Sequence, residues 1–224
     1  MPTLYIANKN YSSWSLRPWV LLRELGIAFD EKLRPFHAGA FTDFSPSGKV
    51  PCLVDGGITV WDSLAITEYL AEAHPAVWPA DKTARAFARC AAAEMHSGFM
   101  VLRTQCGMNC GIRVKLHRTD GALQGDLARL AALWGEGLSR FGGPFLAGDK
   151  FSAADAFYAP VAFRIQTYAP PLDAAANAYA KRLLALPSMR EWYAASLAET
   201  WRDAGHEAEV AEWGTVTEDL RAVA

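Results

Sequence analysis

The transition from strand to helix at residues 10–19 constrains the fold more than any other stretch of the chain. It reads Asn-Tyr-Ser-Ser-Trp-Ser-Leu-Arg-Pro-Trp and follows a short apolar run of strand character. Pro18 fits only the first turn of a helix, so the helix is predicted to be capped near residue 14 or 15. Free N–H groups and a positive dipole gather at such a start. A hydroxyl of Ser12 or Ser13 therefore either caps the helix or donates a hydrogen bond to an anion.

The charge balance and the apolar runs exclude several classes of protein. The 224 residues carry a formal net charge of -2, which gives no reason to expect a nucleic acid or an anionic membrane as partner. No apolar run approaches the roughly 20 residues that span a bilayer, and the N-terminus lacks a signal region. We therefore expect a cytoplasmic protein.

The 4 cysteines are too few and too scattered for a disulfide framework. Cys106 and Cys110 have the spacing of metal ligands on a helix, but no histidine is placed to complete a set. We expect no metal site.

The first 80 residues are predicted to form a small α/β domain. Strands are expected near 3–7 and 28–34, on either side of a helix at 15–25. Two further apolar runs, joined by an Asp-Gly-Gly turn at 55–57, predict a β-hairpin. Asp62 and Ser63 then cap a helix.

Residues 84–224 are predicted to form an all-helical domain, because their apolar side chains recur at helical spacing. One long helix is expected at 84–102 and another at 123–141. Ser152 and Asp155 have the spacing of a capping box that opens a further helix. The polar tail from about 206 is expected to be loosely attached.

Four motifs, in this order and at these separations, resemble those of the glutathione transferases. Residues 12–17 resemble the Ser-Ser-Cys-Ser-x-Arg signature of the zeta class and related bacterial enzymes, with Trp14 in place of cysteine. The others are the Gly-x-Val-Pro motif at 48–51, the acidic-Ser pair at 62–63, and Leu-Ala-Gly-Asp at 146–149 before the capping box. The resemblance implies a thioredoxin-like α/β domain followed by an all-α domain, and a homodimer.

The resemblance also implies glutathione as co-substrate, with its thiol converted to the nucleophilic thiolate. Ser12 would donate a hydrogen bond to the sulfur, Ser13 is the second candidate, and Ser15 is expected to be the cap. The remaining roles concern the tripeptide backbone and its two ends: a cis Val50–Pro51 bond at the cysteinyl backbone, Asp62 and Ser63 at the γ-glutamyl end, and His37 or Lys49 at the glycyl carboxylate.

The substrate pocket implied by the resemblance lies between the loop before the first helix and the start of the second domain. Its candidates are Tyr11, Trp14, Phe99 and Arg103, with Met100, Met108 and Tyr168 as further possibilities. Gly98 would permit close approach of a ligand, of a partner subunit or of a packed helix. Conjugation to a small electrophile is the favoured activity. A glutathione-dependent isomerase of maleylacetoacetate type and a non-catalytic ligand-binding protein are the alternatives.

Overall fold

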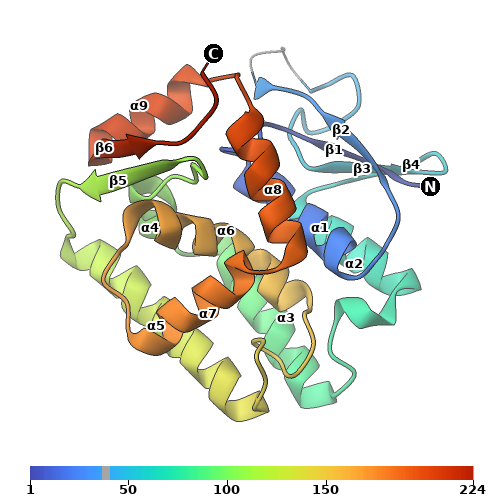
Figure 1. Cartoon of the computed structure of the whole chain (residues 1–224). Helices are drawn as coiled ribbons and strands as arrows, with labels where there is room; N and C mark the ends of the chain where they lie inside the picture. Colours follow the sequence, from blue (N-terminus) through green and yellow to red (C-terminus); the bar gives the residue numbers. More distant parts are fainter. Residues whose placement is uncertain (37–40, 224) are drawn as a thin grey trace.

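The N-terminal part of the chain is a four-stranded mixed sheet with two helices packed against it (Figure 1). The computed structural model describes residues 1–36 and 41–223. The strand order is β2-β1-β3-β4, in which only the β1–β2 pair is parallel. The elements of this part are β1 (Thr3–Ile6), α1 (Ser13–Glu24), β2 (Asp30–Leu33), β3 (Cys52–Asp55), β4 (Ile58–Trp61) and α2 (Ser63–Ala73).

The connections in this part follow from the sequence. The hairpin turns at Gly56 and Gly57, whose φ values of 53° and 92° favour glycine. Helix α1 links the parallel strands β1 and β2, so its first residues lie just beyond the carboxyl end of β1. This places the serines of the loop beyond the carboxyl end of the central strand β1.

Helices dominate the rest of the chain (Figure 1). Helix α6 is buried along nearly its whole length and packs against α1, α3 and α7. The predicted capping box opens α6, since the Ser152 and Asp155 side chains reciprocally bond each other's backbone N–H groups. The helices are α3 (Lys82–Ser97), α4 (Met100–Gln105), α5 (Gly121–Phe141), α6 (Ala153–Tyr168), α7 (Ala174–Leu184), α8 (Pro187–Ala198) and α9 (Ala204–Trp213), and the short η2 (Pro75–Val77) precedes them.

The α/β domain followed by a helical domain confirms the predicted fold class. The exact limits of 1–80 and 84–224 stay predictions. The helix expected at 84–102 is in fact two helices: Gly98 ends α3, and Phe99 adopts a left-handed φ of 54° before α4 begins. The Phe99 side chain is thereby turned into the core, where it packs edge-on against Tyr158 with ring centroids 6.4 Å apart.

The prediction of a loosely attached tail is wrong. Residues after 203 form α9 and strand β6 (Gly214–Asp219), which pairs antiparallel with β5 (Ile112–Leu116). Figure 1 shows this two-stranded sheet and α9 at the opposite side of the molecule from β4. The tail is held mainly by backbone pairing and by ion pairs, which a search for apolar periodicity does not detect.

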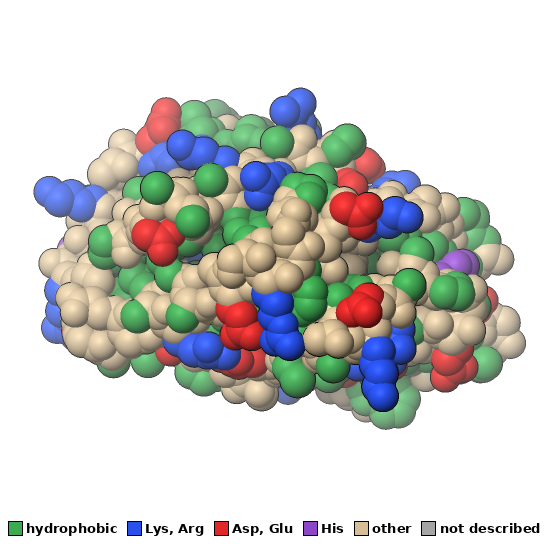
Figure 2. Space-filling view, turned by 90° about the horizontal axis from the view of Figure 1, so that it is seen from below, with side chains coloured by type: hydrophobic (Ala, Val, Ile, Leu, Met, Phe, Trp, Pro, Cys, Tyr) green, Lys and Arg blue, Asp and Glu red, His purple; other side chains and the backbone are tan. Residues whose placement is uncertain are grey.

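The surface matches the small net charge. On the face shown in Figure 2, basic and acidic side chains are interspersed and form no single basic patch. Across the described residues, no helix is both long and apolar enough to cross a bilayer.

Candidate functional site

Two adjoining pockets lie around the start of α1. Their volumes are about 630 and 420 Å³, and Trp14, Lys49 and Val50 line both. Of the predicted site residues, the larger pocket also includes Tyr11, Ser12, Ser13 and Arg103, and the smaller includes Pro51, Asp62 and Ser63. The structure therefore brings most of the predicted site together in one groove.

The N-terminus of α1 lacks a side-chain cap although serine occupies the capping position. Ser12 is the N-cap residue, but its hydroxyl donates to Ser15 Oγ at 2.7 Å instead of accepting a backbone N–H. Ser15 Oγ also accepts from the Ala7 N–H at 3.3 Å. The cap predicted near residue 14 or 15, with Ser15 as the capping residue, is therefore wrong by two or three residues, because Pro18 lies inside α1 and not in its first turn. Because the Ser12 hydroxyl is bonded to Ser15, no side chain accepts a hydrogen bond from the first N–H groups of α1; we call this end of the helix open.

Two residues at the edge of the larger pocket have donors without a partner. Within the described residues, neither the Ser13 hydroxyl nor the Trp14 N–H has a hydrogen-bond acceptor, and both residues line this pocket. The Ser15 N–H also has no acceptor there, but Ser15 is buried and lines neither pocket. Uncompensated N–H groups at a helix start favour a bound anion, since the dipole adds to their partial charge. The arrangement suits a thiolate or a carboxylate.

The smaller pocket is built on the start of α2. Asp62 Oδ1 accepts from the N–H groups of Leu64 and Ala65 at 2.8 and 3.3 Å, so the predicted cap is present. Asp62 holds a φ of 74°, a strained conformation for a residue with a side chain. Its Oδ2 lies 3.5 Å from His96 Nε2. One carboxylate oxygen of Asp62 therefore caps α2, and the other lies near His96.

The neighbours of Asp62 complete this pocket. Ser63 is buried, and its Oγ accepts from Arg17 Nη1 at 3.4 Å. The Val50–Pro51 bond is cis, as predicted. His37, one of the two candidates for the glycyl carboxylate, lies outside the described residues. Lys49, the other, is exposed between the two pockets.

Three arginines surround Trp14 and its neighbours. The guanidinium carbons of Arg17 and Arg103 lie 4.1 and 4.3 Å from the Trp14 ring centroid. Arg164 donates to the carbonyl oxygens of Arg103 and Cys106. Burial, with smaller contributions from the positive charges of Arg103 and Arg164, lowers the pKa of Arg17 to about 9. The region carries positive charge at neutral pH.

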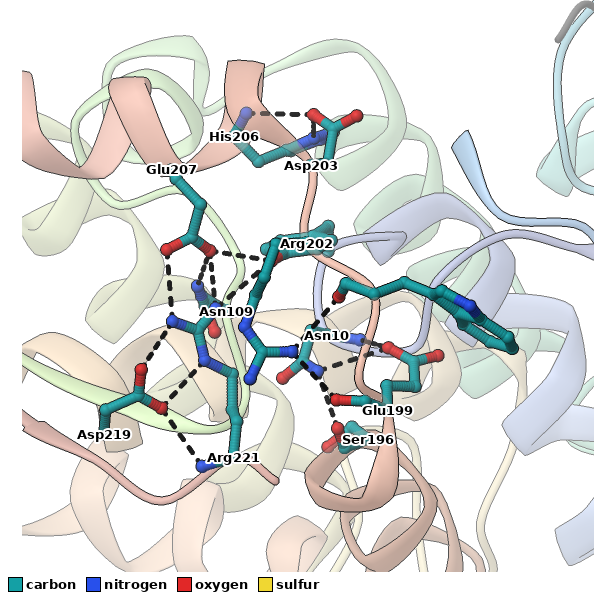
Figure 3. A network of polar contacts seen from close by, with 12 residues as sticks. Asn10, Asn109, Ser196, Glu199, Arg202, Asp203, His206, Glu207, Asp219 and Arg221 are labelled. Atoms are coloured by element: carbon teal, nitrogen blue, oxygen red, sulfur yellow. Dashed lines mark hydrogen bonds and ion pairs between the residues drawn. The ribbon is translucent and has the colours of Figure 1, made fainter. Parts of the chain in front are cut away.

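The pocket wall opposite α1 comes from α9, which sequence reasoning missed. His206, Glu209, Glu212 and Trp213 line the larger pocket. Tyr11 donates to Glu207 at 2.7 Å, and its ring stacks on His206 with centroids 5.0 Å apart. Figure 3 shows Arg221 between Glu207 and Asp219, which it bonds on either side. Asp203 caps α9 and was the one local signal for this helix.

Of the remaining residues predicted for the substrate pocket, some line a pocket and others do not. Met100 and Met108 line the larger pocket, whereas Phe99 lies in the core and lines neither pocket, because of the break at Gly98. The Tyr168 hydroxyl donates to the Gly107 carbonyl at 3.0 Å. Among the described residues, no group of three or more metal-ligating side chains occurs.

A mixed sheet with a cis-proline loop, joined to a helical domain that walls the same groove, defines a two-domain protein of the thioredoxin-like class. Family models for the N-terminal and C-terminal domains of glutathione S-transferases match residues 11–73 and 111–195. The chain is 30% identical over 169 residues to glutathione S-transferase 1 of Dianthus caryophyllus, covering 70% of this chain and 74% of that one. The chain belongs to the glutathione S-transferase family.

The chain is also similar to a probable isomerase and to a structure solved with glutathione. A probable maleylacetoacetate isomerase of Caenorhabditis elegans is 27% identical over 173 residues, which cover 72% of this chain and 78% of the relative. A Burkholderia glutathione transferase homologue, solved with bound glutathione, is 27% identical with a TM-score of 0.65 and covers 85% of this chain and 95% of that one. The zeta-like subtype stays a prediction.

Proposed function

We propose that this protein binds glutathione along the two adjoining pockets and ionises its thiol for attack on a small electrophile. The observation that carries the proposal is the open N-terminus of α1, where a capping serine does not cap and donors face the pocket. A thiol has an ordinary pKa of about 8.5, and hydrogen bonds to its charged form lower that pKa. The glutathione bound to the similar Burkholderia homologue supports the choice of glutathione as ligand.

Ser12 is the proposed donor to the sulfur. Its hydroxyl donates to Ser15 Oγ. On glutathione binding, the hydroxyl can rotate to donate to the thiolate instead. The rotation gives up a neutral hydrogen bond for a charge-assisted one, which is roughly twice as strong. Ser15 keeps its bond from the Ala7 N–H throughout. Ser13 is the alternative donor, because its hydroxyl needs to give up no partner among the described residues.

The tripeptide would extend from the larger pocket into the smaller one. Val50 lines both pockets, where its backbone suits the cysteinyl residue, and Lys49 suits the glycyl carboxylate. Asp62 Oδ2 suits the γ-glutamyl ammonium, while the Ser63 hydroxyl suits its carboxylate. We also expect a homodimer and a cytoplasmic location.

The test compares Ser12→Ala with Ser13→Ala. Losing a hydrogen bond to a charged group costs about 1.5–3 kcal/mol, or about 1–2 pKa units. The ultraviolet absorbance of bound thiolate, titrated against pH, should therefore shift upward by that amount in Ser12→Ala. Turnover at neutral pH should fall, with little change in KM for glutathione. A shift confined to Ser13→Ala would transfer the role to that residue, and no thiolate in the unmodified protein would refute the proposal.

A glutathione-dependent isomerase is the second candidate. The similarity to the Caenorhabditis elegans probable maleylacetoacetate isomerase favours it, and so do the pocket arginines, which suit a carboxylate substrate. In that reaction the thiol adds and then leaves, so glutathione is not consumed. Turnover of a cis-dienoic diacid without loss of glutathione would support isomerisation, whereas stoichiometric loss of free thiol would support conjugation.

A further inference from the structure

Three arginines near the start of α1 have no carboxylate partner. Among the described residues, neither Arg17, Arg103 nor Arg164 forms an ion pair. Arg17 and Arg164 are nevertheless 2% and 4% exposed, and the Nε atom of each is buried with no acceptor. Burying an unpaired charge is costly, so a cluster of this kind is best explained by an anion that it binds.

Two of the three arginines belong to the larger pocket. Arg103 and Arg164 both line it, whereas Arg17 lies against Trp14 and Phe157 and donates toward Ser63 of the smaller pocket. Arg164 donates to the carbonyl of Arg103 at 3.3 Å, which ties the two arginine segments together. The guanidinium groups of Arg103 and Arg164 carry five N–H donors each, and among the described residues they donate only to backbone carbonyls.

The other charges of this pocket leave the two guanidinium groups available. Glu209 and Glu212 line the wall from α9, but neither is within ion-pair distance of Arg103 or Arg164. In the proposed pose, the two glutathione carboxylates bind at Lys49 and Ser63, so neither is assigned to Arg103 or Arg164. The arginines therefore remain for the second substrate.

We propose that the electrophile carries a carboxylate, which binds to Arg103 and Arg164 in the larger pocket. This inference rests on the proposed activation of glutathione at Ser12. In the reaction the thiolate attacks an electrophilic carbon, the new C–S bond forms, and the leaving group departs with the electron pair of the broken bond. The arginines hold the carboxylate and so orient that carbon toward the sulfur; Arg103 is then a specificity-determining residue.

The test uses two electrophiles that differ by one ring carboxylate, chlorodinitrobenzene and its carboxylated analogue chlorodinitrobenzoate. Both lose chloride on attack, so one absorbance assay serves for both. The ratio of kcat/KM for the anionic to the neutral electrophile should fall about 10- to 100-fold in Arg103→Gln, the effect of losing a hydrogen bond between charged groups. Arg103→Lys, which keeps the charge, should recover part of the ratio.

Arg140→Gln is the matched control, since Arg140 is an exposed arginine on α5 paired with Glu136. It should leave the ratio unchanged. An unchanged ratio in Arg103→Gln, together with normal conjugation of the neutral electrophile, would overturn the inference and leave the proposed function intact.

A binding measurement separates the two proposals when turnover is absent. Titration calorimetry of the S-aryl glutathione conjugates, with and without the ring carboxylate, reports the anion site directly. The carboxylated conjugate should bind more tightly, and the difference should shrink in Arg103→Gln. If neither electrophile is conjugated, the proposed activity fails. Equal affinity for the two conjugates would overturn the anion site as well.

Discussion

Replacement of Arg221 by methionine is expected to release α9 from the pocket. The Arg221 side chain is only 4% exposed and lies between two carboxylates. Its guanidinium nitrogens are 2.5 and 3.1 Å from Glu207 and 2.7 Å from Asp219, and Nη1 also donates to the Tyr11 hydroxyl at 3.2 Å. We call these four residues the tail latch. Methionine retains much of the buried volume but removes every one of these bonds.

The magnitude follows from the burial of the latch. Breaking a fully buried ion pair by removing one partner costs about 3–5 kcal/mol. The side chains of Glu207 and Asp219 are 32% and 44% exposed, so solvent recovers part of that loss. A loss of about 2–3 kcal/mol remains, which corresponds to about a 30- to 150-fold change in the opening equilibrium.

Native-state hydrogen exchange measures this opening. The α9 amides should exchange about 30- to 150-fold faster in Arg221→Met, while the α5 amides keep their protection and Arg140→Met changes neither. Equal acceleration in α5 would mean global destabilisation. Unchanged exchange in α9 would show that β6 pairing alone holds the tail, and would refute the reasoning.

The stability that the tail latch gives to α9 should also depend on pH. Burial acts to raise the pKa of Glu207, but hydrogen bonds from Arg221 and Tyr11 outweigh it and hold that pKa below the ordinary 4.5. A depressed carboxylate pKa contributes stability that is present above 4.5 and lost as pH falls through the folded value. The difference in α9 exchange between the unmodified protein and Arg221→Met should therefore shrink under acid conditions.

Two substitutions test the pocket and the core. Asp62→Asn keeps an acceptor for the α2 cap and tolerates the positive φ, so thermal stability should change by less than about 1 kcal/mol. Loss of the charge should raise KM for glutathione about 10-fold, whereas Glu72→Gln on the same helix should not. Asp155→Ala removes the acceptor for the Tyr179 hydroxyl and the Leu146 N–H, both buried. Each unsatisfied buried donor costs about 1–3 kcal/mol, so the expected loss in denaturant unfolding is about 2–6 kcal/mol. A loss below about 1 kcal/mol, comparable to that of exposed Asp149→Ala, would contradict this.

The predictable parts of the site are those that depend on neighbours in the sequence. The α2 cap at Asp62, the capping box at Ser152 and the hairpin turn at 55–57 each involve residues within about four positions of one another. Spacing and residue type suffice for such interactions, because their geometry is fixed by the local backbone.

The parts that could not be predicted depend on distant residues. Tyr11 and Glu207 are separated by 196 positions, and no local pattern connects them. The break after Gly98 interrupts an alanine-rich run whose spacing predicts continuous helix, and burial of Phe99 against Tyr158 outweighs that preference. Arg164 went unnoticed because a single arginine in an apolar helix does not alter its periodicity.

The same long-range contacts fix the loop that carries the proposed thiolate donor. Glu199 accepts from the backbone N–H groups of Lys9 and Asn10 at 2.6 and 3.2 Å. The side-chain amide of Asn10 donates to the Ser196 carbonyl at 2.6 Å (Figure 3). Trp192 donates to the Lys9 carbonyl at 2.8 Å. The backbone just before the serines is therefore positioned by the end of α8, not by the sheet alone. Because a hydroxyl must be placed to within a few tenths of an ångström to stabilise a thiolate, the helical domain contributes to the proposed activating site as well as forming a wall of the larger pocket.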